Sequence, residues 1–84
     1  MRHAWRERLT ELNPEAVILD GYDAAVIGIG AQYEGRMCVV YSEYMILEIL
    51  ARSMGQREAE EYYEFNIASA SYGPSSPIIV DLNT

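Results

Sequence analysis

The sequence predicts a small α+β domain, a small antiparallel β-sheet of about three strands packed with two to three helices in the order α-β-β-α-α-β. Two runs rich in β-branched residues, 24–32 and 36–42, flank a glycine-containing break, which is the pattern of a hairpin. Two segments, 43–54 and 56–68, repeat apolar residues at helical spacing. The chain has 84 residues, half of them apolar. This is enough for one core, so residues 1–84 are expected to form a single domain.

The first third of the chain is predicted to begin with a helix. Residues 3–12 place Trp5, Leu9 and Leu12 at helical spacing, and Asn13-Pro14 then ends the helix. The following stretch EAVILDGYD fits either a short strand or a helical turn. The hairpin comes next, and Gly35 provides the positive φ of its turn. Both hairpin strands are almost continuously apolar, so we expect both of their faces to be covered, with helices on one side.

The helix over 43–54 has clear boundaries. Ser42 is a natural N-cap, Glu43 sits favourably in the first turn, and Gly55 ends the helix. Its expected buried stripe consists of Ile46, Leu47, Leu50 and Met54, with Ile49 beside it.

The next helix, over 56–68, is expected to bury a stripe that includes an amide. The stripe consists of Ala59, Tyr62, Tyr63, Asn66, Ile67 and Ala70. A buried Asn66 needs hydrogen-bond partners, and we expect them in the backbone of the loop that follows. That loop covers residues 71–77. The last strand covers residues 78–82, directly after Pro77, which a strand tolerates at its first position.

The charge of the chain is negative and unevenly distributed. The net charge is −7, with +2 on residues 1–8 and −9 on the remainder, and no lysine is present. Such a field repels nucleic acid and anionic membranes and attracts basic surfaces. No apolar run approaches the ~20 residues that span a bilayer, so no membrane association is expected. A single cysteine, Cys38, excludes an intrachain disulfide and a cysteine-rich zinc site, and it favours a reducing cytosol.

The sequence offers little for catalysis. Its single histidine, His3, lies at the terminus, which disfavours a Ser-His or Cys-His system and a two-histidine metal site. Asp20 and Asp23 in DGYD lack the ligand ladder of a calcium loop, and a turn closed by an Asx-type hydrogen bond is the favoured interpretation. We therefore predict a non-enzymatic protein with no catalytic residue, no metal and no cofactor.

The stretch EAEEYYEFN places four carboxylates on one short helix, at Glu58, Glu60, Glu61 and Glu64. Like charges at i+3 and i+4 cost roughly 0.2–0.5 kcal/mol per pair. The helix N-terminus offsets part of this cost for the first three. The carboxylates form either a solvated outer face or a surface that imitates the phosphates of a nucleic acid. The candidate partner-binding residues are Glu58, Glu60, Glu61, Glu64, Asp20, Asp23 and Glu34.

Residues 58–77 resemble a motif of small, mostly uncharacterised proteins of phages and mobile elements, E-A-x-E-[YF]-x-E-[YF]-N followed by G-A-[YW]-x-G-x-x-[ST]-P. The upstream stretch DGYDAAVIGI is similar to a G-[FY]-D-x-A-[IV]-I-G block of the same family. The chain departs from the motif at Ser69, in place of glycine, and at Ser71, in place of the aromatic. The resemblance implies a phage or prophage protein in the host cytosol, and small acidic proteins of this kind often block a host machine.

These observations lead to one principal hypothesis. The protein is expected to be a phage-encoded inhibitor, an anti-CRISPR protein that blocks the DNA-binding groove of a Cas effector with its acidic residues and does not itself bind nucleic acid. One alternative is a binder of a nucleotide signal, with a pocket lined by Tyr22, Tyr62, Tyr63 and Tyr72. Another is a structural interaction module. We also expect a homodimer in which Arg2, Arg6 or Arg8 faces carboxylates of a second copy.

Overall fold

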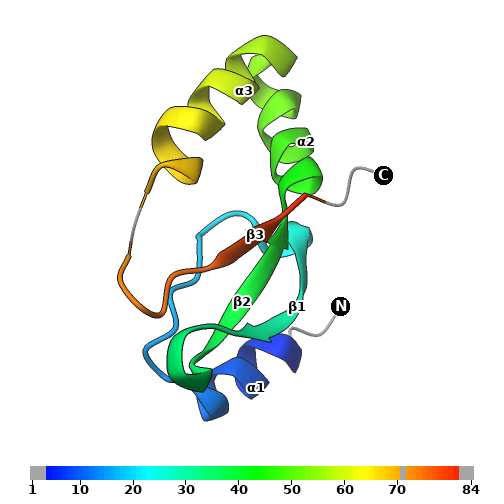
Figure 1. Cartoon of the computed structure of the whole chain (residues 1–84). Helices are drawn as coiled ribbons and strands as arrows, with labels where there is room; N and C mark the ends of the chain where they lie inside the picture. Colours follow the sequence, from blue (N-terminus) through cyan, green and yellow to red (C-terminus); the bar gives the residue numbers. More distant parts are fainter. Residues whose placement is uncertain (1–3, 71, 82–84) are drawn as a thin grey trace.

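The fold has the predicted α+β class and the predicted order of elements (Figure 1). The computed structural model describes residues 4–70 and 72–81. The helices and strands are α1 (Ala4–Leu12), β1 (Val26–Ala31), β2 (Met37–Ser42), α2 (Glu43–Met54), α3 (Gln56–Tyr63) and β3 (Ile78–Val80). Short helical turns add η1 (Asp23–Ala25), η2 (Tyr33–Gly35) and η3 (Glu64–Ala68), of which η3 is a π-helix that continues α3. In Figure 1, α1 lies at one end of the sheet and α2 and α3 at the other.

The sheet is mixed, in the strand order β1-β2-β3. β1 and β2 pair antiparallel, as the hairpin pattern predicted, with Ile29 opposite Val39. β3 pairs with β2 in parallel, with Ile79 beside Tyr41, so the prediction of a wholly antiparallel sheet is wrong for β3. The reason is the connection: α2 and α3 lie between β2 and β3 and form the long crossover that a parallel pair requires.

The core lies between one face of the sheet and the helices. Val39 and Tyr41 of β2 are fully buried there, together with Leu9 of α1. The Tyr41 hydroxyl accepts a 2.8 Å hydrogen bond from the Leu19 N–H. This bond holds the stretch that fitted either strand or helix, of which residues 15–22 belong to neither and Asp23 begins η1.

Two expectations about burial fail at the periphery. Leu12 is 47% exposed at the end of α1, whereas Leu9 is buried in the core and Trp5 packs against it. β1 is not covered on both faces, since Ile27 and Ala31 are exposed, Ile27 at a register shift between Val26 and Gly28. The prediction that both faces are covered agrees better with β2, the central strand, because none of its residues is exposed.

The boundaries of α2 are confirmed. The Ser42 side chain accepts a 3.3 Å hydrogen bond from the Met45 N–H, as an N-cap does. Gly55 ends the helix with φ 84°, a conformation that favours glycine. Ile46 and Leu50 are buried, and the other members of the predicted stripe are partly buried.

The predicted burial of Asn66 is wrong. Its side chain is exposed, and its Nδ2 donates a 3.1 Å bond to the Tyr62 carbonyl one turn back. The buried stripe is narrower than predicted and consists of Ala59, Tyr63 and Ile67. The π-helical turn is the physical reason: with more residues per turn, it rotates Asn66 away from the core, while Ile67 keeps its predicted position above Tyr63.

The loop before β3 is held by residues other than Asn66. Asn13 Nδ2 donates to Ser75 Oγ at 3.1 Å and to the Met37 carbonyl at 2.9 Å. Gln32 Nε2 donates to the Ser76 carbonyl at 2.7 Å. Both donors are distant in sequence from the loop, so helical periodicity gave no indication of them. The predicted helix start at residue 3, Ser71 of the loop, and the predicted strand end at residue 82 lie outside the described residues.

Candidate protein-binding surface

All four carboxylates of the predicted acidic helix are exposed. Successive residues turn about 100° around a helix, so the four carboxylates form two rows along its exposed surface. Glu58 and Glu61 lie on the side that points directly away from the core, and Glu60 and Glu64 lie closer to α2. No ion pair between described residues involves any of these four side chains. Their charge is therefore available to a partner.

Two aromatic side chains share the outward side of this helix. Phe65 is 81% exposed and Tyr62 is 43% exposed. With Glu58 and Glu61 they follow the spacing i, i+3, i+4 and i+7, which places all four on one face. Exposed aromatic residues are enriched where proteins bind one another. The predicted core position of Tyr62 is thus wrong, and Tyr62 belongs to the surface.

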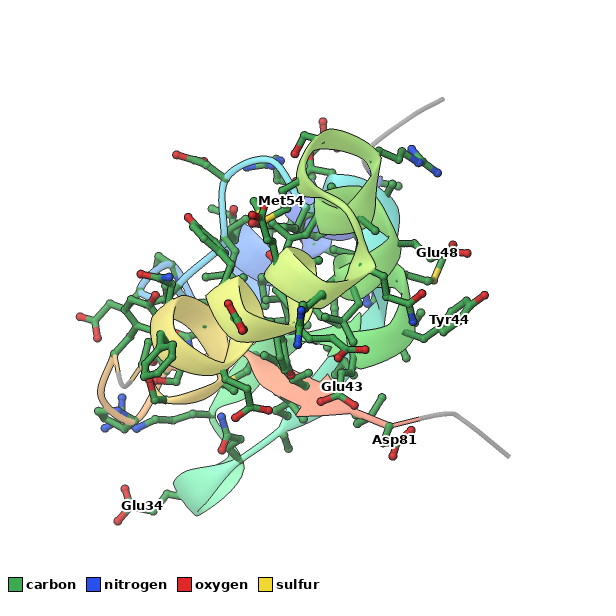
Figure 2. The ribbon with its side chains drawn as sticks, turned by 90° about the horizontal axis from the view of Figure 1, so that it is seen from above. Glu34, Glu43, Tyr44, Glu48, Met54 and Asp81 are labelled. Carbon is green, nitrogen blue, oxygen red and sulfur yellow. The ribbon has the colours of Figure 1, made fainter. Side chains whose placement is uncertain are left out.

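Two further carboxylates extend the acidic surface beyond α3. The Tyr63 hydroxyl donates a hydrogen bond to Glu43, the first residue of α2. Burial raises the pKa of Tyr63 well above its ordinary value of 10, and Glu43, Glu64 and Asp81 raise it further. Three elements therefore bring carboxylates together around one buried tyrosine. Figure 2 shows Glu43 and Asp81 close to one another and on the same side as Glu48.

Sequence reasoning missed Glu43, Glu48 and Asp81 as surface residues. Glu43 and Glu48 both belong to α2, and Asp81 follows β3, so only the fold brings them beside α3. The prediction relied on several glutamates close together on one helix, and these three residues are not part of such a group.

The other predicted site residues belong to segments outside α3. Asp23 forms an ion pair with Arg6, whose Nη2 donates to both carboxylate oxygens at 2.9 and 3.0 Å. Asp20 is exposed near the buried Tyr41 hydroxyl, whose pKa is raised mainly by burial. Glu34 occupies the tip of the hairpin, with φ 56°, and Figure 2 shows it projecting on the side away from Glu43 and Glu48. Of these three residues, Asp23 has its charge paired with Arg6, and Glu34 projects from the hairpin tip.

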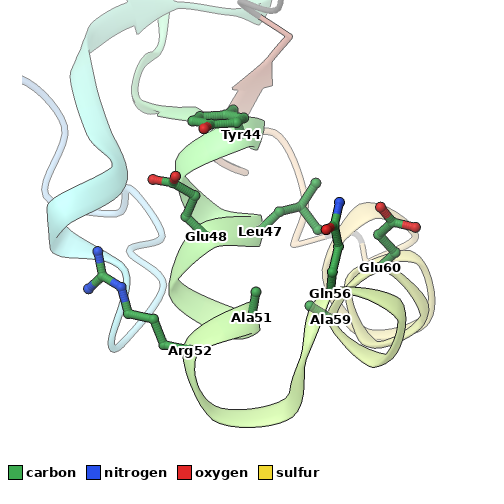
Figure 3. A pocket seen from close by; sticks show the side chains of 8 residues that line it. All are labelled: Tyr44, Leu47, Glu48, Ala51, Arg52, Gln56, Ala59 and Glu60. Carbon is green, nitrogen blue, oxygen red and sulfur yellow. The ribbon is translucent and has the colours of Figure 1, made fainter.

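A groove runs between α2 and α3. Its volume is about 430 Å³, and its lining residues are Tyr44, Leu47, Glu48, Ala51, Arg52, Gln56, Ala59 and Glu60. Figure 3 shows Tyr44, Glu48 and Arg52 along α2, Gln56 and Glu60 on α3, and Leu47 and Ala51 between the two helices. The groove exists because alanines occupy two positions where the helices face one another. The side of α3 that carries Glu60 thus forms one wall of the groove.

The four tyrosines of the nucleotide-binding alternative are distributed over different places. Tyr63 is buried against Glu43, and Tyr72 lines a second cavity of about 200 Å³ beneath the β3 loop. None of the four lines the groove between α2 and α3. Burial raises the pKa of Tyr22, and Tyr62 lies close enough to raise it further.

Comparisons of the chain with protein-family models, curated proteins and solved structures found no match. Within residues 4–70 and 72–81, no helix combines the length and the apolar character that a membrane span needs. The same residues contain no group of three or more His, Cys, Asp or Glu side chains placed to hold a metal ion. The acidic surface and the groove beside it are therefore the features on which a functional argument can be built.

Proposed function

We propose that this protein is a non-enzymatic inhibitor that binds a nucleic-acid-binding protein and blocks its basic groove. The observation that carries the proposal is the set of exposed carboxylates on α3 and at the start of η3 that have no ion pair among the described residues. Side chains at i and i+4 lie about 5–6 Å apart. This spacing is of the same order as that of the charges along a nucleic-acid strand. Tyr62 and Phe65 add apolar contact area to the same helix.

The resemblance to phage and mobile-element proteins supports a specific target. In that setting we propose an anti-CRISPR protein that acts in the host cytosol on a Cas effector. The net charge of −7 makes direct binding to nucleic acid unfavourable and binding to a basic groove favourable. Attraction of this kind accelerates encounter and weakens as salt rises.

The experiment is a competition assay. Effector complexes purified from the host are mixed with their DNA target, and DNA binding is measured while this protein is added at increasing concentration. We expect inhibition by the wild type and no inhibition by the Glu60→Arg/Glu64→Arg variant. The matched control is Glu7→Arg/Glu11→Arg, which changes the same total charge at i, i+4 on α1, where both side chains are exposed. Equal inhibition by the two variants would contradict a role for α3.

The homodimer predicted from the basic N-terminus remains a proposal in a narrower form. Arg6 is bound to Asp23 of its own chain, and Leu9 is buried in its own core. Arg2 lies outside the described residues, so Arg8 is the exposed arginine of α1 that can face a second copy. Light scattering of the wild type and Arg8→Glu tests this: loss of a dimer in the variant supports it, and a monomeric wild type at micromolar concentration contradicts it.

A further inference from the structure

We propose that the groove between α2 and α3 binds an arginine side chain of the basic partner. This inference rests on the proposed function and identifies the chemistry of one contact within it. The volume of about 430 Å³ falls within the range of roughly 300–1,000 Å³ that is typical of ligand pockets. It leaves room for one long side chain and part of the backbone that carries it.

The floor of the groove is apolar. Ala59 is buried, and Leu47 and Ala51 are partly buried between the two helices (Figure 3). An arginine carries a three-carbon stem that packs well on such a surface while its charged end stays near water. The floor therefore fits the stem.

The walls fit the charged end. Glu48 rises from α2 and Glu60 from α3, on opposite sides of the floor. The Tyr44 hydroxyl donates a hydrogen bond to Glu48, which keeps that ring beside that carboxylate. A guanidinium has five donors in one plane, so it can bind the carboxylate of either wall and also lie against an aromatic ring. An ammonium group is a compact point charge and satisfies this arrangement less well.

Other occupants fit the groove poorly. An apolar side chain would remove water from Glu48 and Glu60 without giving them a partner. An anionic group would meet both carboxylates. Arg52 lies at the end of the groove away from Tyr44 (Figure 3) and sets the direction of binding. It repels the guanidinium toward the Tyr44 end, and it can donate to a backbone carbonyl of the partner.

The probe is Nα-acetyl-arginine methylamide, followed by backbone amide NMR of the 84-residue chain. We expect chemical-shift changes centred on Ala51, Gln56 and Ala59. The matched ligand control is the citrulline analogue, in which a neutral urea replaces the guanidinium. Binding of citrulline as tight as that of arginine would overturn the proposal.

Four substitutions locate the contact. Glu48→Gln and Glu60→Gln should each weaken arginine binding about twofold to fivefold, the range of an exposed charged pair. Ala51→Leu fills the floor without altering charge and should abolish binding. Arg52→Gln should strengthen binding, because it removes a repelling cation. The matched control is Glu11→Gln on α1, which should leave binding unchanged. An Ala51→Leu protein that keeps its amide spectrum and still binds would overturn the proposal.

A hexa-arginine peptide separates this inference from the proposed function. Salt-sensitive binding of the peptide that is weakened by Ala51→Leu supports the groove as the contact. Salt-sensitive binding that is equal in the wild type and Ala51→Leu would overturn the groove and leave the acidic surface as the binding site. Absence of binding at low salt would contradict both.

Discussion

The hydroxyl of Tyr63 on α3 donates a hydrogen bond to the carboxylate of Glu43 at the start of α2. Tyr63 is buried, and its bond joins the two helices that form the groove. The same residue lies among the carboxylates of the acidic surface. This contact therefore links the stability of the helix pair to the position of the charges that we propose a partner binds.

Replacing Tyr63 by phenylalanine tests that link. Tyr63→Phe removes the donor and keeps the ring in the core, so we expect the free energy of unfolding to fall by about 0.5–1.5 kcal/mol. Chemical denaturation measures the change. Tyr72→Phe, at an exposed tyrosine, is the matched control and should have little effect. Equal stability of Tyr63→Phe and the wild type would mean that the bond contributes nothing.

Alkaline pH should destabilise the protein. Burial, with the bond to Glu43 and the nearby carboxylates, raises the pKa of Tyr63 above the value of 10 that it has in the unfolded chain. Between the two pKa values the unfolded state binds fewer protons, so stability is fully present below pH 10 and falls as the pH rises toward the folded pKa. Denaturation across this range, followed by tyrosinate absorbance, measures the slope. Tyr63→Phe should have a shallower slope, and an identical slope would contradict the assignment.

Asn66 and Ile67 should respond in opposite ways. Asn66→Leu should change the free energy of unfolding by less than about 0.5 kcal/mol, because the side chain is exposed and bonded only within its own helix. Ile67→Ala should cost about 2–5 kcal/mol, because it empties a buried position. Thermal and chemical denaturation of the pair measure both. Strong destabilisation by Asn66→Leu would place the amide in the core after all.

The ion pair between Arg6 and Asp23 should affect stability and leave partner binding unchanged. Both side chains are partly exposed, so Asp23→Asn should cost about 0.2–1 kcal/mol, and added salt should reduce the difference. Affinity for the target should equal that of the wild type, since the charge of Asp23 is already paired with Arg6. A loss of affinity in a folded Asp23→Asn protein would return Asp23 to the binding surface.

Local signals in the sequence predicted the elements of the fold, and contacts between distant residues escaped them. Ser42 and Gly55 mark the ends of α2 through their own chemistry, so both were identified correctly. The direction of β3 depends on where two helices return the chain, which no local pattern encodes. The π-helical turn changed the helical period after Tyr63, so an α-helical template placed Asn66 on the wrong side.

The candidate surface was also predictable only where its signal is local in the sequence. The four glutamates over residues 58–64 predicted the acidic surface of this helix. Glu43, Glu48 and Asp81 join it through tertiary packing, and Asp23 leaves it because Arg6 lies within reach. The groove required the fold, because its floor combines Leu47 and Ala51 of one helix with Ala59 of another.

The most direct test of the account is the effect of Glu60→Arg/Glu64→Arg on inhibition of DNA binding by a Cas effector. The fold of the variant is first checked by its melting temperature. The account predicts that the wild type and Glu7→Arg/Glu11→Arg inhibit alike, that the inhibition weakens as salt rises, and that the α3 variant does not inhibit. Inhibition by the folded α3 variant at wild-type strength, or failure of the wild type to inhibit any effector of its host, would contradict it.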